Sequence, residues 1–252
     1  MKLQNNVAVV TGAASGMGKA ISILFAKEGA KVVLADFDIE GATKVAEEIT
    51  TSGGVAMAFK TDVSIQSDVD NLIDNAIKSY GSVDILINNA GIMDNFMPVE
   101  KVTDELWDKI LAVNTTGPMK LIRKVMPIFL EKKKGIIVNI ASIGGIAGSR
   151  AGVAYTSSKY ALIGLTKNIG FQYANLGIRC NAIAPGGVNT NIGKTINAPD
   201  KFGMERAMSG ATNNPRMGES AEIASVALFL ACDDSSLVNG SVVTADGGWT
   251  AY

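Results

Sequence analysis

Short runs of β-branched residues alternate with longer amphipathic segments along the whole chain, and this alternation constrains the fold most strongly. Strands are predicted at residues 7–11, 31–36, 55–61, 83–88, 135–141, 179–184 and 241–245. Helices are predicted between them, at residues 16–28, 39–50, 67–80, 103–131, 153–175 and 221–231. Repeated strand–helix–strand units produce a parallel sheet covered by helices on both faces. We expect one doubly wound α/β domain over residues 1–252.

The charge and hydropathy patterns limit the partners of such a domain. The formal net charge is −1 and the basic residues are dispersed, so neither nucleic acid nor a membrane is expected as a partner. The lysine run at residues 132–134 is better explained as a solvated helix end. The N-terminal segment lacks the apolar stretch of a secretory signal, and no apolar run is long enough to span a bilayer. We therefore expect a cytoplasmic protein.

The chain contains no histidine, and this absence excludes several chemistries. A Ser-His-Asp hydrolase, a His-ligated catalytic zinc and a dehydrogenase with a His acid all need that side chain. The two cysteines, Cys180 and Cys232, are too few for a disulfide scaffold and lack metal-ligand spacing. No metal site is expected, and any acid or base must be Tyr, Lys, Asp or Glu.

A glycine-rich turn follows the first predicted strand and leads into a helix. Its sequence is Thr11-Gly12-Ala13-Ala14-Ser15-Gly16-Met17-Gly18. Gly12 permits a tight turn, Gly16 lets the backbone approach a pyrophosphate, and Gly18 allows the helix to pack closely on the strand. The helix N-terminus attracts the anion. The spacing differs from G-x-G-x-x-G, because three residues separate the first two glycines. We interpret the segment as a dinucleotide site, although a bare structural turn has the same composition.

Asp36, which ends the second predicted strand, indicates the cofactor. A carboxylate about 20 residues beyond the glycine turn can accept hydrogen bonds from an adenosine ribose and repels a 2′-phosphate. No Arg or Lys occurs at residues 13–15 or directly after Asp36, where Phe37 follows. NAD(H) is therefore favoured over NADP(H); the alternative is an Asp that caps the next turn.

Polar residues also follow the third and fourth predicted strands, where a doubly wound sheet binds its ligand. Asp62-Val63 follows the third strand, and Asn88-Asn89-Ala90-Gly91 follows the fourth. Asp62 could contact the adenine amino group, and the second cluster could present its backbone to the adenosine. Either cluster could instead satisfy only local turn hydrogen bonds.

Tyr155 and Lys159 are four residues apart in a predicted helix, so their side chains are neighbours. We expect the ammonium to lower the tyrosine pKa from its ordinary value of about 10 by roughly 1–3 units. The phenol could then donate a proton near neutral pH. An isolated pair of this kind is more often a half-buried aromatic ring beside a lysine whose ammonium reaches the solvent. The other motifs of the chain argue against this alternative, among them Ser142, thirteen residues upstream of Tyr155.

Together these segments resemble the short-chain dehydrogenase/reductase family over essentially the whole chain. The glycine turn, the Asp-Val pair, the Asn-Asn-Ala-Gly motif and the Tyr/Lys pair match in order, and Pro185-Gly186 and the final Asp246-Gly247-Gly248 also match. The resemblance implies a Rossmann-like fold with seven parallel strands. It also implies a homotetramer in which the helices at residues 103–131 and 153–175 pack against their mates.

The resemblance further implies which residues act. The family's catalytic tetrad matches Asn114, Ser142, Tyr155 and Lys159. Tyr155 would deliver a proton to a carbonyl oxygen, Ser142 would donate a hydrogen bond to it, Lys159 would stabilise the phenolate and hold the nicotinamide ribose, and Asn114 would hold a water. The cofactor residues expected from the motifs and the resemblance are Gly12, Ser15, Gly16, Met17, Gly18, Asp36, Phe37, Asp62, Val63, Asn89, Ala90, Gly91, Tyr155, Lys159, Pro185, Gly186, Val188 and Thr190.

The substrate is less well defined than the reaction. Residues 190–217 break the strand–helix rhythm and are rich in Asn, Gly and Pro, which favours a substrate lid over a surface loop. Arg150 could bind an anionic group, but a loop arginine is more often solvated or at a subunit contact. The candidate pocket residues suggest a moderately apolar site and are Met93, Asn95, Phe96, Ile143, Gly144 and Gly187.

The expected function is NAD(H)-dependent interconversion of a secondary alcohol and a ketone by hydride transfer. The alternative is a β-ketoacyl thioester (carrier-protein) reductase, against which Asp36 and a scarcity of positive charge near residues 171–176 count. A non-catalytic nucleotide-binding protein is a third possibility, because a fold alone does not establish function. Such a protein has little need for an intact tetrad.

Overall fold

The structure is a computed structural model that describes residues 1–251, and its strands form one parallel sheet of seven strands in the order β3-β2-β1-β4-β5-β6-β7. The predicted Rossmann-like architecture is confirmed. The strands are β1 (Val7–Thr11), β2 (Lys31–Asp36), β3 (Val55–Lys60), β4 (Ile85–Asn88), β5 (Gly135–Ile140), β6 (Ile178–Pro185) and β7 (Val242–Ala245).

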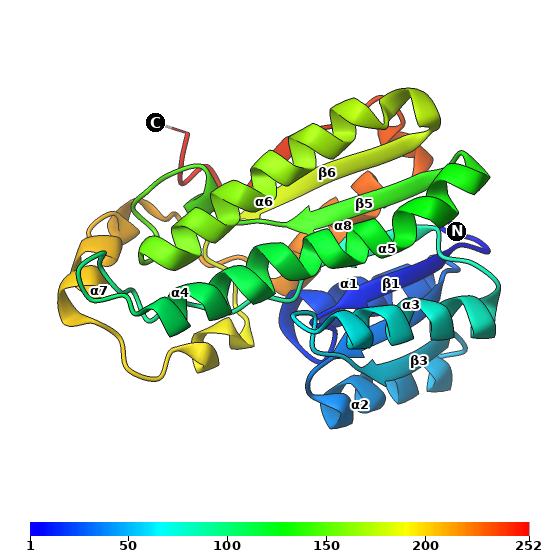
Figure 1. Cartoon of the computed structure of the whole chain (residues 1–252), viewed down its shortest axis with the longest axis horizontal. Helices are drawn as coiled ribbons and strands as arrows, with labels where there is room; N and C mark the ends of the chain where they lie inside the picture. Colours follow the sequence, from blue (N-terminus) through cyan, green and yellow to red (C-terminus); the bar gives the residue numbers. More distant parts are fainter. Residues whose placement is uncertain (252) are drawn as a thin grey trace.

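Helices cover both faces of the sheet (Figure 1). Those of the described range are α1 (Gly16–Lys27), α2 (Ile39–Thr51), α3 (Gln66–Tyr80), α4 (Asp104–Leu111), α5 (Gly117–Lys132), α6 (Val153–Gln172), α7 (Lys201–Met208) and α8 (Ser220–Ala231). None of them is both long and apolar enough to cross a membrane.

Two apolar cores lie on opposite faces of the sheet, because successive strand residues point to opposite sides. In β1, Val10 belongs to the core shared with α1, α2 and α8, whereas Val9 belongs to the core shared with α3 and α5. All five residues of β1 are buried, which explains why a central strand reads as an unbroken apolar run.

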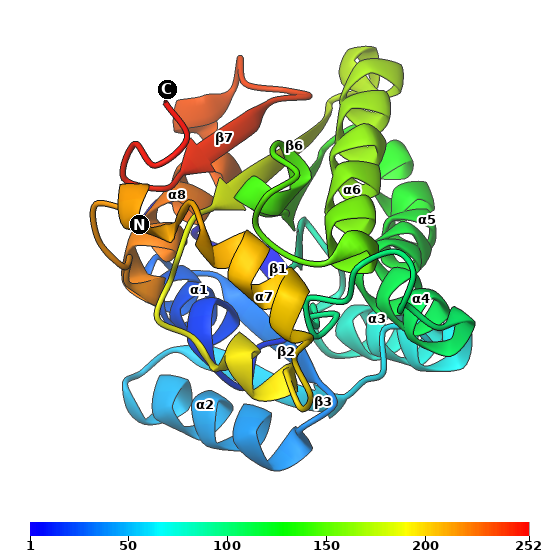
Figure 2. The ribbon, with the colours of Figure 1, turned by 90° about the vertical axis from the view of Figure 1, so that its left-hand side faces the viewer.

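The strand order reverses between β1 and β4, which pair directly although two strands separate them in the sequence. Ligands of doubly wound sheets bind at such a switch point, beyond the carboxyl ends of the strands. Figure 2 looks onto this edge and shows α7 in front of it. The fold therefore directs the search for a site to this edge.

The predicted helix at residues 103–131 is present as a helical backbone from Asp104 to Lys132, but its hydrogen-bonding pattern changes in the middle. A π-helical segment, Ala112–Thr116, separates α4 from α5. Pro118 lies in the first turn of α5 and has no N–H to donate to the i−4 carbonyl of an α-helix. Gly117 packs closely on Val63, since a Cβ at Gly117 would lie 2.9 Å from Cγ2 of Val63. The interruption matters because Asn114 lies within it.

The segment at residues 190–217 is less irregular than expected. It contains α7 and two short 3₁₀ turns, Asn191–Thr195 and Ala211–Asn213. Asp200 caps α7 by accepting a hydrogen bond from the Gly203 N–H at 2.8 Å, a local signal that the composition argument overlooked. Elsewhere the predicted ends differ by a few residues: β4 begins at Ile85 rather than at residue 83, and α6 ends at Gln172, before a separate turn, Ala174–Leu176.

Candidate functional site

The glycine turn between β1 and α1 forms a cradle that side chains would fill. Gly12 and Gly16 have φ of +64° and +55°, in the left-handed region that favours glycine. A Cβ at Gly12 would lie 2.8 Å from Nδ2 of Asn89, and one at Gly18 would overlap the Gly12 carbonyl oxygen. Ser15 begins α1 without a side-chain capping bond, so its hydroxyl does not block the helix N-terminus.

The Asp36 carboxylate is joined to the glycine turn. Its Oδ2 accepts a hydrogen bond from the Ala14 N–H at 2.9 Å, and its Oδ1 accepts one from the Asp38 N–H at 2.9 Å. Asp36 therefore caps the turn that follows it, as the alternative interpretation predicted. Asp36 is only half-buried at the end of β2, so the carboxylate can still contact a ligand.

Lys60 is a neighbour of Asp36 that the sequence argument missed. The two residues are partners in the register of β2 and β3, and the Lys60 ammonium lies 5.6 Å from the ring centroid of exposed Phe37. Strand register brings residues 24 positions apart in the chain to the same point, and a cation placed in this way does not show among the residues next to Asp36 in the sequence.

The end of β4 is tied to the glycine turn by Asn89. Its Nδ2 donates hydrogen bonds to the carbonyl oxygens of Thr11 and Gly12 at 2.9 and 3.0 Å, while its buried Oδ1 has no partner in the described part of the chain. The Thr11 hydroxyl accepts hydrogen bonds from the backbone of Asn89 and Ala90 at 3.0 and 3.1 Å, and so helps to place Gly91. Asn88 instead donates to Oδ1 of Asn139 within the core.

Asp62 makes the local turn contacts of the alternative interpretation. Its Oδ1 accepts hydrogen bonds from the backbone and the hydroxyl of Ser64 at 2.9 and 2.6 Å. Val63 is buried against Gly117. Thr190 lies beside the glycine turn, since a Cβ at Gly16 would be 3.2 Å from Cβ of Thr190.

Tyr155, Lys159 and Ser142 lie together at the start of α6. Tyr155 and Lys159 are 7% and 3% exposed, and the ammonium is 5.6 Å from the tyrosine ring centroid. A Cβ at Gly144 would lie 3.3 Å from Oγ of Ser142 and 3.4 Å from Cε1 of Tyr155, so this glycine keeps the space between the two groups open.

The remaining tetrad residue, Asn114, is fully buried and forms its hydrogen bonds with residues outside the tetrad. Its Oδ1 accepts a hydrogen bond from the Ile92 N–H at 2.9 Å, and its Nδ2 donates to the Ile92 carbonyl at 3.0 Å and to the Ser158 hydroxyl at 3.1 Å. A Cβ at Gly91 would lie 3.4 Å from Oδ1 of Asn114 and 3.5 Å from Nζ of Lys159. The π segment therefore brings Asn114 beside the lysine.

Burial, rather than the lysine charge, dominates the titration of the tyrosine. Desolvation raises the pKa of Tyr155 to about 12, a hydrogen bond with Ser142 opposes this rise, and the Asp94 carboxylate adds to it. Burial also lowers the pKa of Lys159 to about 8. The expected lowering of the tyrosine pKa by Lys159 is therefore wrong in this structure, where the ammonium donates to the Ile140 carbonyl at 2.9 Å instead of to the phenol.

The lowered Lys159 pKa predicts a pH dependence of stability. Between pH 8 and 10.5 the unfolded lysine still binds a proton that the folded one has released, so the free energy of unfolding gains a contribution that rises with pH. The full contribution is about 3 kcal/mol. We expect Lys159→Met to remove this rise when urea unfolding is compared with wild type at several pH values. The same rise in both proteins would contradict the assignment.

The candidate substrate residues lie in three places. Gly144 lies next to Tyr155, and Ile143 beside it is buried. The Met93 N–H donates to Oγ1 of Thr195, and Oδ1 of Asn95 accepts from the Asn197 N–H, both at 3.0 Å, so these two contact the segment at residues 190–217.

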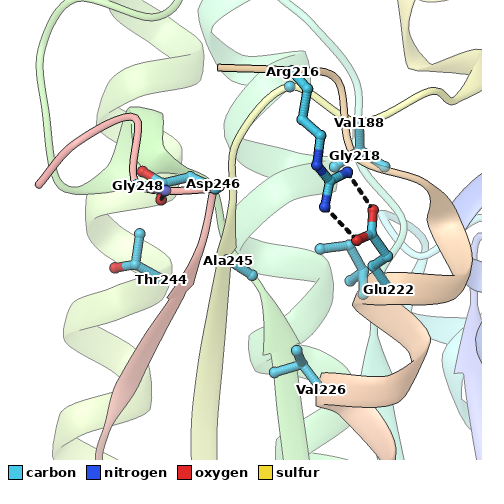
Figure 3. A pocket seen from close by; sticks show the side chains of 12 residues that line it. Val188, Arg216, Gly218, Glu222, Val226, Thr244, Ala245, Asp246 and Gly248 are labelled. Atoms are coloured by element: carbon cyan, nitrogen blue, oxygen red, sulfur yellow. Dashed lines mark hydrogen bonds and ion pairs between the residues drawn. The ribbon is translucent and has the colours of Figure 1, made fainter. Parts of the chain in front are cut away.

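Gly187 and Val188 line a hollow of about 240 Å³ between β6, β7 and α8 (Figure 3). Arg216 and Glu222 also line the hollow and form an ion pair with N–O distances of 2.8 and 2.6 Å. None of the four tetrad residues is among those that line it. Pro185 is buried at the end of β6, and Gly186 after it packs closely on Asp246.

Arg150 stacks on Trp249, with its guanidinium carbon 4.4 Å from the ring centroid. It also donates to the carbonyl and hydroxyl of Ser149. The indole N–H of Trp249 donates to the Gly210 carbonyl at 2.8 Å, so the arginine serves in a contact between the C-terminal tail and the segment at residues 190–217. Arg150 is thus packed within its own chain, which neither the anion-binding interpretation nor the solvated or subunit-contact alternative predicted.

Comparisons with known proteins agree with this geometry. The family model described as enoyl-(acyl carrier protein) reductase matches residues 12–250. The 3β-hydroxysteroid dehydrogenase 2 of Eggerthella lenta is 42% identical over 251 residues, which cover 99% of this chain and 96% of that protein. The 3-oxoacyl-[acyl-carrier-protein] reductase of Thermotoga maritima is 36% identical over 98% of this chain and 99% of its own.

A solved structure from Beutenbergia cavernae, described as an NAD(P)-dependent gluconate 5-dehydrogenase with bound NADP at low occupancy, superposes with a TM-score of 0.89. It is 35% identical, and the match covers 100% of this chain and 99% of that one. The B. cavernae structure shares the architecture of this chain, and the three proteins differ in the substrates that their names state.

Proposed function

Because this chain belongs to the short-chain dehydrogenase/reductase family, we propose that it is an NAD(H)-dependent oxidoreductase that interconverts a secondary alcohol and a ketone, with Tyr155 as acid and base. The observation that carries the proposal is the cluster of Tyr155, Ser142 and Lys159 at the carboxyl edge of the sheet, on the same edge as a glycine cradle. The chain has no histidine that could replace the tyrosine as acid.

The residues at the cradle fit a nicotinamide dinucleotide. Side chains at Gly12 and Gly18 would collide with Asn89 and with the Gly12 carbonyl oxygen, so the two glycines let the turn pack closely at the N-terminus of α1. The backbone N–H groups of that terminus attract a pyrophosphate. We assign Asp36, Phe37 and the backbone of Gly91 to the adenosine, and Val188 and Thr190 to the nicotinamide half. When bound, the cofactor supplies or accepts a hydride.

The side chains of the cluster have complementary roles. The Tyr155 hydroxyl gives its proton to the carbonyl oxygen during reduction and takes one from the alcohol during oxidation. Its high pKa suits the reducing direction, in which the hydroxyl must be protonated before it can donate, and disfavours the phenolate that oxidation requires. Ser142 donates a hydrogen bond to the same oxygen as negative charge develops there. Lys159 holds positive charge near the phenol, and Asn114 fixes the backbone of Ile92 next to it.

The preference for NAD(H) rests on the Asp36 carboxylate, and Lys60 opposes it. We expect Asp36→Ala to reduce the ratio of kcat/KM with NADH to that with NADPH by about 10- to 100-fold, because hydrogen bonds to a charged group contribute about 1.5–3 kcal/mol. Lys60, its partner in the sheet register, would then favour the 2′-phosphate. Initial rates with both cofactors measure the ratio.

Asp38→Ala is the matched control for this substitution. Asp38 is an exposed carboxylate two residues away that caps α2 through the Gly41 N–H. Its removal should weaken the helix cap and leave the cofactor ratio unchanged. A wild-type enzyme that prefers NADPH would contradict the assignment of Asp36.

For the substrate we propose an apolar secondary alcohol or ketone, with hydroxysteroids among the first compounds to test. The segment at residues 190–217 exposes Phe202, Met204, Met208 and Met217, and an apolar lid suits an apolar substrate. The E. lenta relative acts on 3β-hydroxysteroids according to its name. A panel of hydroxysteroids, cyclic and linear ketones and sugar acids, followed as NADH or NADPH absorbance, tests the proposal.

The runner-up is a β-ketoacyl thioester reductase, which the description of the matching family model and the T. maritima relative favour. An acetoacetyl thioester belongs in the same panel. A kcat/KM for the thioester at least tenfold above that of every simple ketone would establish this alternative. NADH binding without turnover of any compound would instead support a non-catalytic role.

We also propose that the enzyme is a cytoplasmic homotetramer. Phe171 and Tyr160 are 85% and 47% exposed on α6, and apolar side chains exposed on a long helix favour a subunit contact there. Light scattering of the purified protein measures the mass directly, and a monomer would contradict this expectation.

A further inference from the structure

Asp94 is a buried carboxylate outside the tetrad, and it contacts the end of α6 that carries Tyr155. It is 0% exposed, and within residues 1–251 no lysine or arginine forms an ion pair with it. Its oxygens instead accept three backbone hydrogen bonds, from Phe96 at 3.2 Å, Gly152 at 3.1 Å and Tyr155 at 2.8 Å. A buried carboxylate is costly unless such bonds compensate, so its position is closely specified.

Two of these bonds cap the N-terminus of α6 from a distant part of the chain. Gly152 occupies the capping position and has no side chain, and Tyr155 is the third residue of the helix. An N-cap side chain ordinarily bonds to the N–H of that third residue. Here Asp94 provides the acceptor from 61 positions away, and its charge also suits the positive end of the helix dipole.

Gly152 makes this approach possible. A Cβ at this position would lie 2.5 Å from Oδ2 of Asp94 and 2.5 Å from the backbone nitrogen of Met97. The Val153 N–H also donates to the Met97 carbonyl at 3.1 Å. The loop at residues 92–97 is therefore packed directly on the backbone that carries Tyr155.

The other side of the same loop carries the lid, residues 190–217. Asn95 accepts hydrogen bonds at its side chain from Asn197 at 3.0 Å and at its carbonyl from Asp200 at 2.9 Å. Gly203 of α7 packs against the Phe96 carbonyl so closely that no Cβ would fit. Asn95 and Phe96 both have φ of +57°, a conformation that side-chain-bearing residues rarely adopt without compensating contacts.

We propose that Asp94 is a positioning residue for Tyr155, and that the loop at residues 92–97 couples the position of the lid to that of the proton donor. This inference rests on the proposed function of Tyr155. A substrate that closes the lid pulls on Asn95, and the adjacent Asp94 transmits the movement to the first turn of α6. The lid then affects proton transfer as well as substrate affinity.

Two substitutions test the two sides of the loop. Asp94→Asn keeps the size of the side chain and removes one acceptor, and Asn95→Gly keeps the left-handed backbone while removing the bond to Asn197. We expect each to lower kcat by about 10- to 100-fold, since small displacements of a catalytic group have effects of this size. The Kd for NADH should change by no more than about twofold. Thr103→Ala, which removes the cap of α4, is the matched control and should leave kcat unchanged.

Hydrogen–deuterium exchange provides a readout that does not depend on turnover. In both Asp94→Asn and Asn95→Gly, peptides covering residues 152–158 and 195–203 should exchange faster together, while those of α2 keep the wild-type rate. Faster exchange in only one of the two regions, or a wild-type kcat in Asp94→Asn, would overturn the inference. Absence of turnover in the wild type with the coupled exchange intact would instead overturn the proposed function.

Discussion

Tyr155→Phe is expected to reduce kcat by about 100- to 10 000-fold, the range attributed to a positioned acid or base. The substitution removes one oxygen and keeps the ring, which is 7% exposed and packed at the start of α6. The fold and the Kd for NADH should therefore stay close to wild type. Steady-state rates with the best substrate of the panel and fluorescence titration with NADH measure the two quantities separately.

Tyr160→Phe is the matched control, because Tyr160 lies five residues further along α6 and is 47% exposed. It loses the same oxygen at a position that does not face the cluster, so its kcat should equal that of wild type. If Tyr155→Phe retained more than a tenth of wild-type kcat, Tyr155 could not be the principal proton donor.

Gly18→Ala is expected to have the largest effect on cofactor binding. The added Cβ would overlap the Gly12 carbonyl oxygen and lie 2.6 Å from Nδ2 of Asn89, so α1 has to move away from the turn. Overpacking of this kind costs about 1–3 kcal/mol, which corresponds to roughly 2–4 °C of melting temperature per kcal/mol in a domain of this size. Because the helix N-terminus moves with it, we expect the Kd for NADH to rise about tenfold or more.

Gly164→Ala separates this effect from the general effect of adding a methyl group to a helix. Gly164 lies within α6, and a Cβ there would meet no atom within 4 Å. The substitution should leave the Kd for NADH unchanged. Equal Kd values in Gly18→Ala and wild type would show that the cradle does not hold the cofactor.

The fold could be predicted because its determinants are local in the sequence. Fully buried strands such as β1 and β5 appear as apolar runs of about the length of a strand, and the helices between them show their own periodicity. The π segment escaped prediction, since the residues on both sides of Asn114 are compatible with one long helix. The hydrogen bonds of Asn114 to Ile92, 22 positions away, are contacts that helix periodicity does not report.

The candidate site was predicted in its residues more completely than in its electrostatics. Spacing predicted Tyr155 and Lys159 as neighbours, and the structure places the ammonium 5.6 Å from the ring. Spacing could not reveal that both groups are buried, nor that Asp94 approaches from another loop. These features raise the pKa of Tyr155 to about 12 rather than lowering it. Lys60 was missed for the same reason, because strand register places it opposite Asp36.

The sequence by itself determined the order of strands and helices, the glycine turn and the identity of the groups that can exchange a proton in a chain without histidine. Only the tertiary structure decided how strongly those groups hold their protons, which cation lies opposite Asp36 and which carboxylate holds the first turn of α6. The physical reason is that backbone periodicity and helix neighbours depend on residues a few positions apart. Desolvation and charge interactions depend instead on every segment that packs around a group, however distant it is in the chain.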